Sequence, residues 1–218
     1  MILSLAIRGI KRYNDKAIIE WISYIKQEDF GMKQGLLIVG IMLSAVLLVG
    51  CTGGMDSIMT NTMTVHKDGK IADVSVEDFS DGDYSMTDLE QFVTDEVNAY
   101  NTANGEGSIE IKEIQTENSL AKLKLTYQDM TTYNAFNHTE YVLADAAQAE
   151  LTGDLIVKSD GTTVKAADID TDGLKVLEVS DAMDIVCKGK VQYYNSYVTE
   201  VNGTYTANGE GVAVIVFK

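Results

Sequence analysis

A short acidic stretch in the C-terminal part of the chain has side chains and spacing that suit a calcium ion. Three aspartates, Asp168, Asp170 and Asp172, alternate with other residues and are followed by Gly173. Alternate carboxylates can converge on one point while glycine makes a sharp bend, which is how a hard cation such as Ca²⁺ collects oxygen ligands. These three aspartates are therefore the candidate metal ligands of the chain, and Ca²⁺ is the cofactor that they would take.

The acidic stretch resembles only the front half of an EF-hand-type loop. That pattern requires glutamate six residues after the glycine, where this chain has Val179, and Glu178 comes one residue early. Lys175 would also lie close to the ion, and no helix is expected before the loop. Because aspartate favours turns for local reasons, the sequence favours an ordinary turn without a metal and keeps Ca²⁺ as the alternative.

Aromatic residues gather near the C-terminus and suggest a second kind of site. Tyrosine rings on a sheet can stack on sugars or contact a peptide. They are also ordinary strand formers, so a glycan-binding surface is one of two interpretations. The residues concerned are Tyr193, Tyr194, Tyr197 and Tyr205.

The sequence predicts no catalytic residue. Cys187 ends a run in which every second residue is apolar, so we expect a small buried side chain on the inner face of a strand. A catalytic thiol needs a basic partner, and the only histidines are His66, beside an expected turn, and His138, between expected helices. We therefore expect a protein that is not an enzyme.

Residues 32–50 have the order of parts of a secretory signal, with a basic start, an uncharged apolar run and small residues at the end. Its last residues and the cysteine that follows, Leu48-Val49-Gly50-Cys51, resemble the lipobox of bacterial lipoproteins. This resemblance implies that Cys51 becomes the mature N-terminus and carries diacylglycerol and further acyl chains such as palmitate. It also implies that the protein is held on the extracytoplasmic face of the bacterial cell membrane. The alternative is an uncleaved anchor, but the apolar run is shorter than the ~20 residues of a membrane-spanning helix.

Residues 1–31 mix basic and acidic side chains, unlike the short basic start of a signal. We expect them to be an over-extended start, with Met32 as the true first residue. The alternative is a cytoplasmic amphipathic extension.

The exported part is strongly acidic. The whole chain has a formal net charge of −16, and residues 1–50 hold six of the 17 basic and four of the 33 acidic residues, which leaves −18 for residues 51–218. Such a charge argues against nucleic acid as a partner. The expected partners are the membrane, through acylated Cys51, and an envelope protein, peptide or glycan whose identity the sequence does not give. Cys187 is the only cysteine besides Cys51, so no disulfide within the exported part is expected.

Residues 51–61 are small and polar, and we expect them to be a tether. Residues 62–218 should form one α+β domain. Alternation on both sides of Asp68-Gly69 predicts a β-hairpin, and Thr87 with Glu90 forms a capping-box pattern that starts an amphipathic helix over residues 88–100.

Further strands and helices complete the expected fold. In residues 121–128 the apolar residues share one face, which places Lys122 and Lys124 on a solvent face. Residues 130–151 predict one or two short helices, and residues 155–217 predict six strands. The last strand, residues 212–217, is apolar in both phases and should lie inside a sheet. The expected fold is a mainly antiparallel sheet with one long amphipathic helix and one or two short helices packed on one face.

Residues 102–107 recur letter for letter as residues 206–211. The repeat is either a trace of a duplicated β unit or two independent Asn-Gly turns.

The expected function is that of a lipid-anchored surface module that binds or scaffolds another molecule at the envelope. In its lipobox and general character the chain is similar to small uncharacterised surface lipoproteins of Gram-positive bacteria. The alternative function is a calcium- or glycan-binding receptor component.

Overall fold

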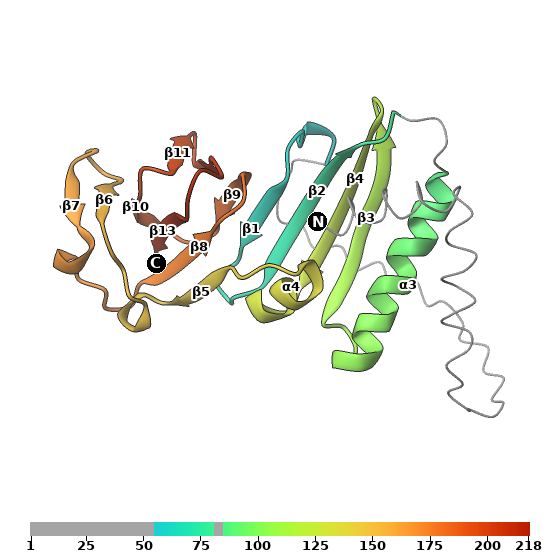
Figure 1. Cartoon of the computed structure of the whole chain (residues 1–218), viewed down its shortest axis with the longest axis horizontal. Helices are drawn as coiled ribbons and strands as arrows, with labels where there is room; N and C mark the ends of the chain where they lie inside the picture. The colour runs from blue at the N-terminus through green and yellow to red at the C-terminus, as the bar shows by residue number, and fades with distance from the viewer. Residues whose placement is uncertain (1–54, 81–84) are drawn as a thin grey trace.

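The computed structural model of the chain describes residues 55–80 and 85–218. The predicted signal and the lipidation residue Cys51 lie outside the described residues. Two β-sheets lie side by side along the longest axis, with helix α3 (Met86–Asn104) at one end and strand β7 (Thr163–Lys165) at the other (Figure 1). In the described part of the chain, no helix is both long and apolar enough to cross a bilayer.

The first sheet has seven strands and carries both described α-helices. Its pairs are antiparallel except for the parallel pair of β1 and β9. In order across the sheet, the strands are β11 (Val198–Val201), β12 (Thr204–Ala207), β9 (Met183–Cys187), β1 (Thr62–Val65), β2 (Ile71–Asp78), β4 (Leu120–Tyr127) and β3 (Ile109–Glu117).

The second sheet has six strands, and all its pairs are antiparallel. Two 3₁₀ turns, η2 (Ala146–Gln148) and η3 (Ala166–Asp168), follow its outer strands β5 and β7. In order, the strands are β5 (Val142–Asp145), β8 (Lys175–Val179), β13 (Ala213–Phe217), β10 (Val191–Tyr194), β6 (Asp154–Val157) and β7.

Helices α3 and α4 (Met130–Asn137) cover the apolar face of the first sheet. The buried side chains Leu89 and Val93 of α3 share a core cluster with Leu123 and Leu125 of β4. Helix α4 starts where the Asp129 carboxylate accepts a hydrogen bond from the Thr132 amide at 2.7 Å. The fold is therefore of the α+β class with mainly antiparallel strands, as the sequence predicts, but the strands form two sheets and not the single sheet that was expected.

Strand β13 lies between β8 and β10, which confirms that the last strand lies inside a sheet, but it begins at Ala213, and Val212 is 48% exposed. Ile215 and Phe217 belong to the cluster that also holds the core of the first sheet, whereas Val216 faces a smaller cluster with Leu155 and Val176. One continuous core thus joins the two sheets, and a second core covers the other face of the second sheet.

The start of α3 differs from the expected capping box. The helix begins at Met86 with Ser85 in the N-cap position, and no side chain caps it. Thr87 lies inside the helix, so the predicted pairing of Thr87 with Glu90 across the helix start is wrong.

The region after α4 also differs from the prediction. His138 ends the helix in a left-handed conformation (φ 55°), but the chain then forms strand β5 and the short turn η2 rather than a second helix. Strand β5 pairs with β8, and tertiary pairing of this kind overrides the weak helical pattern of residues 142–151. The structure also has the hairpin of β11 and β12, which the six strands predicted for residues 155–217 do not include.

Most of the predicted tether is attached to the domain. Met55–Ser57 forms a 3₁₀ turn, η1, and Met55 is only 2% exposed. Lys122, expected in solvent, is 1% exposed because η1 covers the face of the sheet on which it lies. The tether prediction is therefore wrong for residues 55–61, and residues 51–54 lie outside the described part.

The repeated six residues have two different structures. Residues 102–104 are the last turn of α3, whereas residues 206 and 207 end strand β12. The repeat is therefore not a duplicated structural unit, and its shared feature is the positive φ of Gly105 and Gly209.

Candidate functional site

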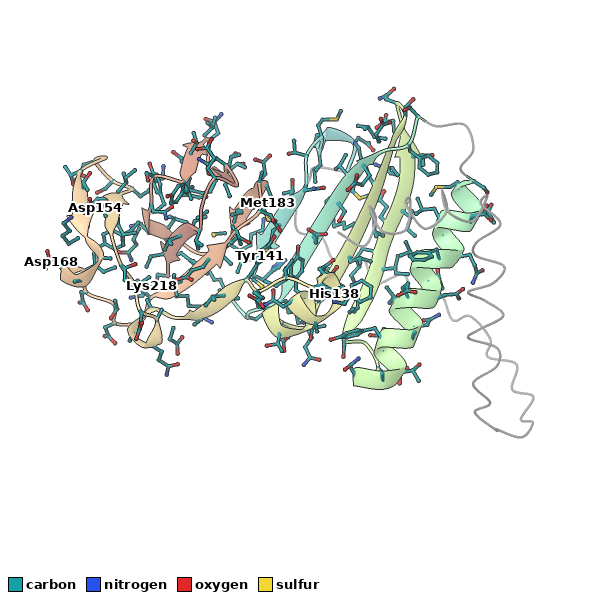
Figure 2. The ribbon with its side chains drawn as sticks, in the orientation of Figure 1. His138, Tyr141, Asp154, Asp168, Met183 and Lys218 are labelled. Carbon is teal, nitrogen blue, oxygen red and sulfur yellow. The ribbon has the colours of Figure 1, made fainter. Side chains whose placement is uncertain are left out.

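The candidate site is an open pocket of about 480 Å³ at the end of the second sheet. Its walls come from the end of β6, from β7, from the end of η3 and the two residues that follow it, and from β10. Figure 2 shows Asp154 and Asp168 at this end of the molecule, far from the helices. The lining residues are Val157, Thr163, Val164, Lys165, Asp168, Ile169, Asp170 and Tyr193.

The order of the strands brings these residues together. Tyr193 of β10 pairs with Val157 of β6, and the preceding residue of β6, Ile156, pairs with Thr163 of β7. The chain then turns through η3 and returns Asp168 and Asp170 to the same pocket. The acidic stretch and one of the four tyrosines, Tyr193, which are separate features of the sequence, thus meet at one place.

Three charged side chains line the pocket: Lys165, Asp168 and Asp170. The Nζ of Lys165 lies 2.5 Å from the Asp154 carboxylate, whose hydrogen bond and charge raise the pKa of Lys165. Lys165 is therefore paired with Asp154, whereas Asp168 and Asp170 add negative charge to the pocket. This balance disfavours an anionic ligand.

The acidic stretch does not form the three-ligand site that a calcium loop requires. The Asp170 carboxylate accepts a hydrogen bond from the amide of Asp172 at 3.1 Å, and Asp172 does not line the pocket. Within residues 55–80 and 85–218, no group of three or more histidine, cysteine, aspartate or glutamate side chains is placed to hold a metal ion. Val179, at the position where an EF-hand has its last ligand, is 1% exposed in β8.

The four tyrosines do not form one surface. Neighbouring residues of a strand point to opposite faces, so Tyr193 lines the pocket whereas Tyr194 packs against Tyr205 with ring centroids 6.0 Å apart. Tyr205 is buried, and its burial raises its pKa to about 12. The ring of Tyr197 lies against Gly211, where a Cβ atom would come within 2.5 Å of Cζ. Only Tyr193 is thus in position to contact a ligand in the pocket.

Cys187 and His66 have the properties of packed residues. Cys187 is partly buried on β9 beside the main core, and burial raises the pKa of its thiol to about 12, so the thiol is protonated at neutral pH. His66 is half-buried at the β1–β2 turn, and burial lowers its pKa; the charge of Asp68 opposes this effect, and the charges of Lys188 and Lys70 add to it.

A second polar cluster, which the sequence did not reveal, lies inside the first sheet. Asp73 of β2 pairs with Met63 and Leu125, so its side chain enters the core beneath the helices, where it is 5% exposed. The Ser75 hydroxyl donates to its carboxylate at 2.8 Å. Burial is the main cause that raises the pKa of Asp73.

Three tyrosines from β4, α4 and the chain before β5 surround this buried carboxyl. The Nδ2 of Asn137 donates to the Tyr127 hydroxyl at 3.1 Å, and the rings of Tyr127 and Tyr133 lie 4.9 Å apart. Tyr141 stacks on Tyr133 at 5.8 Å and donates its hydroxyl to Asp181. Burial raises the pKa of all three tyrosines, so they are neutral donors in a closed core rather than groups that a dissolved ligand can reach.

Comparison with known proteins gives no relative for this chain: no family model, no curated protein and no solved structure matches it.

Proposed function

We propose that the protein is a lipid-anchored, extracytoplasmic binding module of a bacterial cell membrane and is not an enzyme. The anchor rests on Leu48-Val49-Gly50-Cys51, and binding rests on one observation, the pocket in which Tyr193 meets Asp168 and Asp170.

The ligand that this pocket fits best is a neutral sugar, which is the glycan-binding alternative. A sugar ring has an apolar face that stacks on an aromatic ring such as Tyr193, and hydroxyls that donate hydrogen bonds to carboxylates. Asp168 and Asp170 supply such acceptors, and Val164 and Ile169 supply apolar contact. Negative charge in the pocket disfavours phosphorylated or acidic sugars.

Sugar binding is tested by calorimetry with the purified full chain and neutral oligosaccharides, with cellohexaose and the hexamer of N-acetylglucosamine as probes. We expect Tyr193→Ala to weaken binding up to about tenfold, because an aromatic contact contributes about 0.5–1.5 kcal/mol. Tyr197→Ala is the matched control, since Tyr197 lies outside the pocket. Equal affinity in the wild type and Tyr193→Ala would contradict this ligand site.

Calcium is the other ligand that the acidic stretch suggests. A ligand that binds only the folded state raises the melting temperature with its concentration. We expect millimolar Ca²⁺ after EGTA to leave the melting temperature unchanged, because Asp172 does not join Asp168 and Asp170 in the pocket. A rise that Asp170→Ala abolishes would instead favour a calcium-dependent module.

The anchor is tested by replacing the lipidated residue. Cys51→Ser should leave the precursor uncleaved and without lipid, as seen by intact mass and by labelling with a radioactive fatty acid. A cleaved, lipid-labelled serine variant would refute the anchor.

A further inference from the structure

The chain immediately after the predicted lipid attachment is fastened to the first sheet. Only three residues separate Cys51 from Met55, which is 2% exposed against the sheet. We call residues 55–61 the anchor-proximal segment. Its contacts decide whether the domain moves freely on a tether or is held in one orientation.

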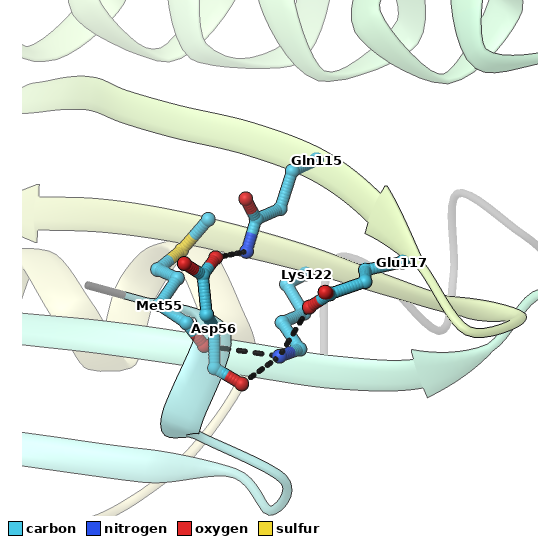
Figure 3. Close-up of polar contacts among 5 residues, drawn as sticks. All are labelled: Met55, Asp56, Gln115, Glu117 and Lys122. Carbon is cyan, nitrogen blue, oxygen red and sulfur yellow. Dashed lines mark hydrogen bonds and ion pairs between the residues drawn. The ribbon is translucent and has the colours of Figure 1, made fainter.

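Lys122 makes the first attachment. Its side chain is 1% exposed, and its Nζ donates to the carbonyl oxygens of Met55 and Asp56, each at 3.0 Å (Figure 3). The Glu117 carboxylate lies 3.8 Å from the same Nζ, and Gln115 donates to the Asp56 carboxylate at 3.3 Å. A buried ammonium group requires partners for its donors, and the two carbonyls of η1 provide them.

The attachment continues along the segment to β1. The Thr60 hydroxyl donates to the Asp184 carboxylate at 2.8 Å, and the Asp184 amide donates to the Asn61 carbonyl at 2.9 Å. The side-chain oxygen of Asn61 accepts from the Val76 amide at 2.8 Å. Contacts to β4, β9 and β2 thus hold the segment at both of its ends.

We infer that the anchor-proximal segment is a rigid connection that orients the domain on the phospholipid surface. The inference rests on the proposed lipid at Cys51. Four backbone steps from Cys51 to Met55 span at most about 14 Å, at ~3.6 Å per residue. Strands β3 and β4, to which η1 is bound, therefore stay close to the headgroups.

The same connection directs the pocket away from the membrane. Strands β3 and β4 lie toward one end of the longest axis, and β6 and β7, which line the pocket, lie at the other (Figure 1). The acidic charge of the domain gives no attraction to anionic headgroups that could turn it over. A ligand in the medium or in the cell wall can thus reach the pocket from the side away from the membrane.

The orientation is tested by energy transfer in reconstituted vesicles. The full chain, processed and lipidated in a bacterial host, is placed in phosphatidylcholine vesicles that contain a headgroup-labelled acceptor lipid. Single fluorophores are attached at Ser119→Cys, in the β3–β4 turn, or at Ser159→Cys, in the β6–β7 turn, with Cys187→Ala in the background. Both serines are exposed, so the labels do not disturb the core. We expect strong transfer from position 119 and weak transfer from position 159.

Loss of the Lys122 contacts should reduce this difference. In Lys122→Met the ammonium group is removed, and the two positions should approach equal transfer. Lys124→Met is the matched control, because Lys124 lies on the same face of β4 and η1 does not bond to it; it should keep the wild-type difference. Met55→Ser weakens the same connection by changing the buried residue of η1. It replaces Lys122→Met in this test if Lys122→Met does not fold.

The outcomes separate the orientation from the anchor. Equal transfer from both positions in a lipidated wild-type protein, or stronger transfer from position 159, would overturn the rigid connection alone. A protein that carries no lipid by intact mass and does not float with the vesicles would overturn the anchor, and with it the orientation.

Discussion

Replacing the buried carboxyl Asp73 by asparagine should stabilise the protein at neutral pH. Asp73 enters the core beneath the helices beside Met63 and Leu125, and its one hydrogen bond among those described comes from Ser75. An amide oxygen can accept the same bond without a charge. The change therefore removes the cost of burying a carboxylate while it keeps the shape of the side chain.

The size of the effect follows from the pKa of this group. Burial raises the pKa of Asp73 above its ordinary value of 3.8. Between the ordinary and the raised pKa, the folded protein holds a proton that the unfolded chain has released. The part of the free energy of unfolding that depends on protonated Asp73 is therefore fully present below pH 3.8. It is lost as the pH rises through the pKa that Asp73 has in the folded protein. In that window the free energy of unfolding should fall by ~1.4 kcal/mol per pH unit.

Urea unfolding at a series of pH values measures this directly. Asp73→Asn should lose that slope and exceed the wild type in stability at pH 7. Asp78→Asn is the control on the same strand: bonds from Ser80 lower the pKa of the exposed Asp78, so its loss should not stabilise the protein. An Asp73→Asn protein that is less stable than the wild type at pH 7, with the wild-type pH slope, would refute the reasoning.

Three further predictions concern packing, capping and reactivity. Gly189→Ala should destabilise by about 1–3 kcal/mol, measured by thermal unfolding, because its Cβ would lie 2.5 Å from the carbonyl oxygen of Lys218. Asp129→Ala should cost about 1 kcal/mol in the same assay through loss of the N-cap bond to Thr132. Because burial raises the pKa of Cys187 to about 12, iodoacetamide should label the native thiol about a thousandfold more slowly than a free cysteine at pH 7.5 and at the ordinary rate in urea.

Turns could be predicted from the sequence where a glycine lies between two segments of alternating apolar and polar residues. The Asp68-Gly69 turn joins β1 and β2 as expected, with Gly69 at φ 89°. The missed hairpin of β11 and β12 carries a similar signal, since Asn202 and Gly203 have φ values of 52° and 83°, as a two-residue hairpin turn requires. Asn202-Gly203 is therefore a sequence signal for a turn with one strand on each side.

Identical residues do not give identical structure when their neighbours differ. The shared six residues follow the helical pattern of Leu89, Val93 and Val97 in one case and strand β12 in the other. Their backbone continues the element that precedes them as far as the glycine, where positive φ ends it. A repeat this short therefore predicts the position of a break in the chain and not the element before it.

The candidate pocket could not be assembled from the sequence, because its residues become neighbours only through the strand order. Asp168 and Tyr193 are separated by β8 and β9 along the chain, and β8 lies elsewhere in the sheet while β9 belongs to the other sheet. The pairing of β10 with β6 brings Tyr193 next to Val157. The kinds of side chain in the pocket could be predicted from the sequence, but their proximity depends on the order of the strands in the sheet.

Lys122 shows the limit of strand alternation most clearly. Alternation correctly separates Lys122 from the face of Ala121 and Leu123, which the helices cover. It does not indicate what lies on the other face, and there Met55 and Asp56 bring backbone carbonyls to the ammonium group. A polar residue on the outer face of a strand is therefore exposed only if no other segment returns to that face. In this chain the returning segment directly follows the predicted lipid site, so a lysine that looked like a solvated surface residue is the residue whose loss should free the domain to change its orientation.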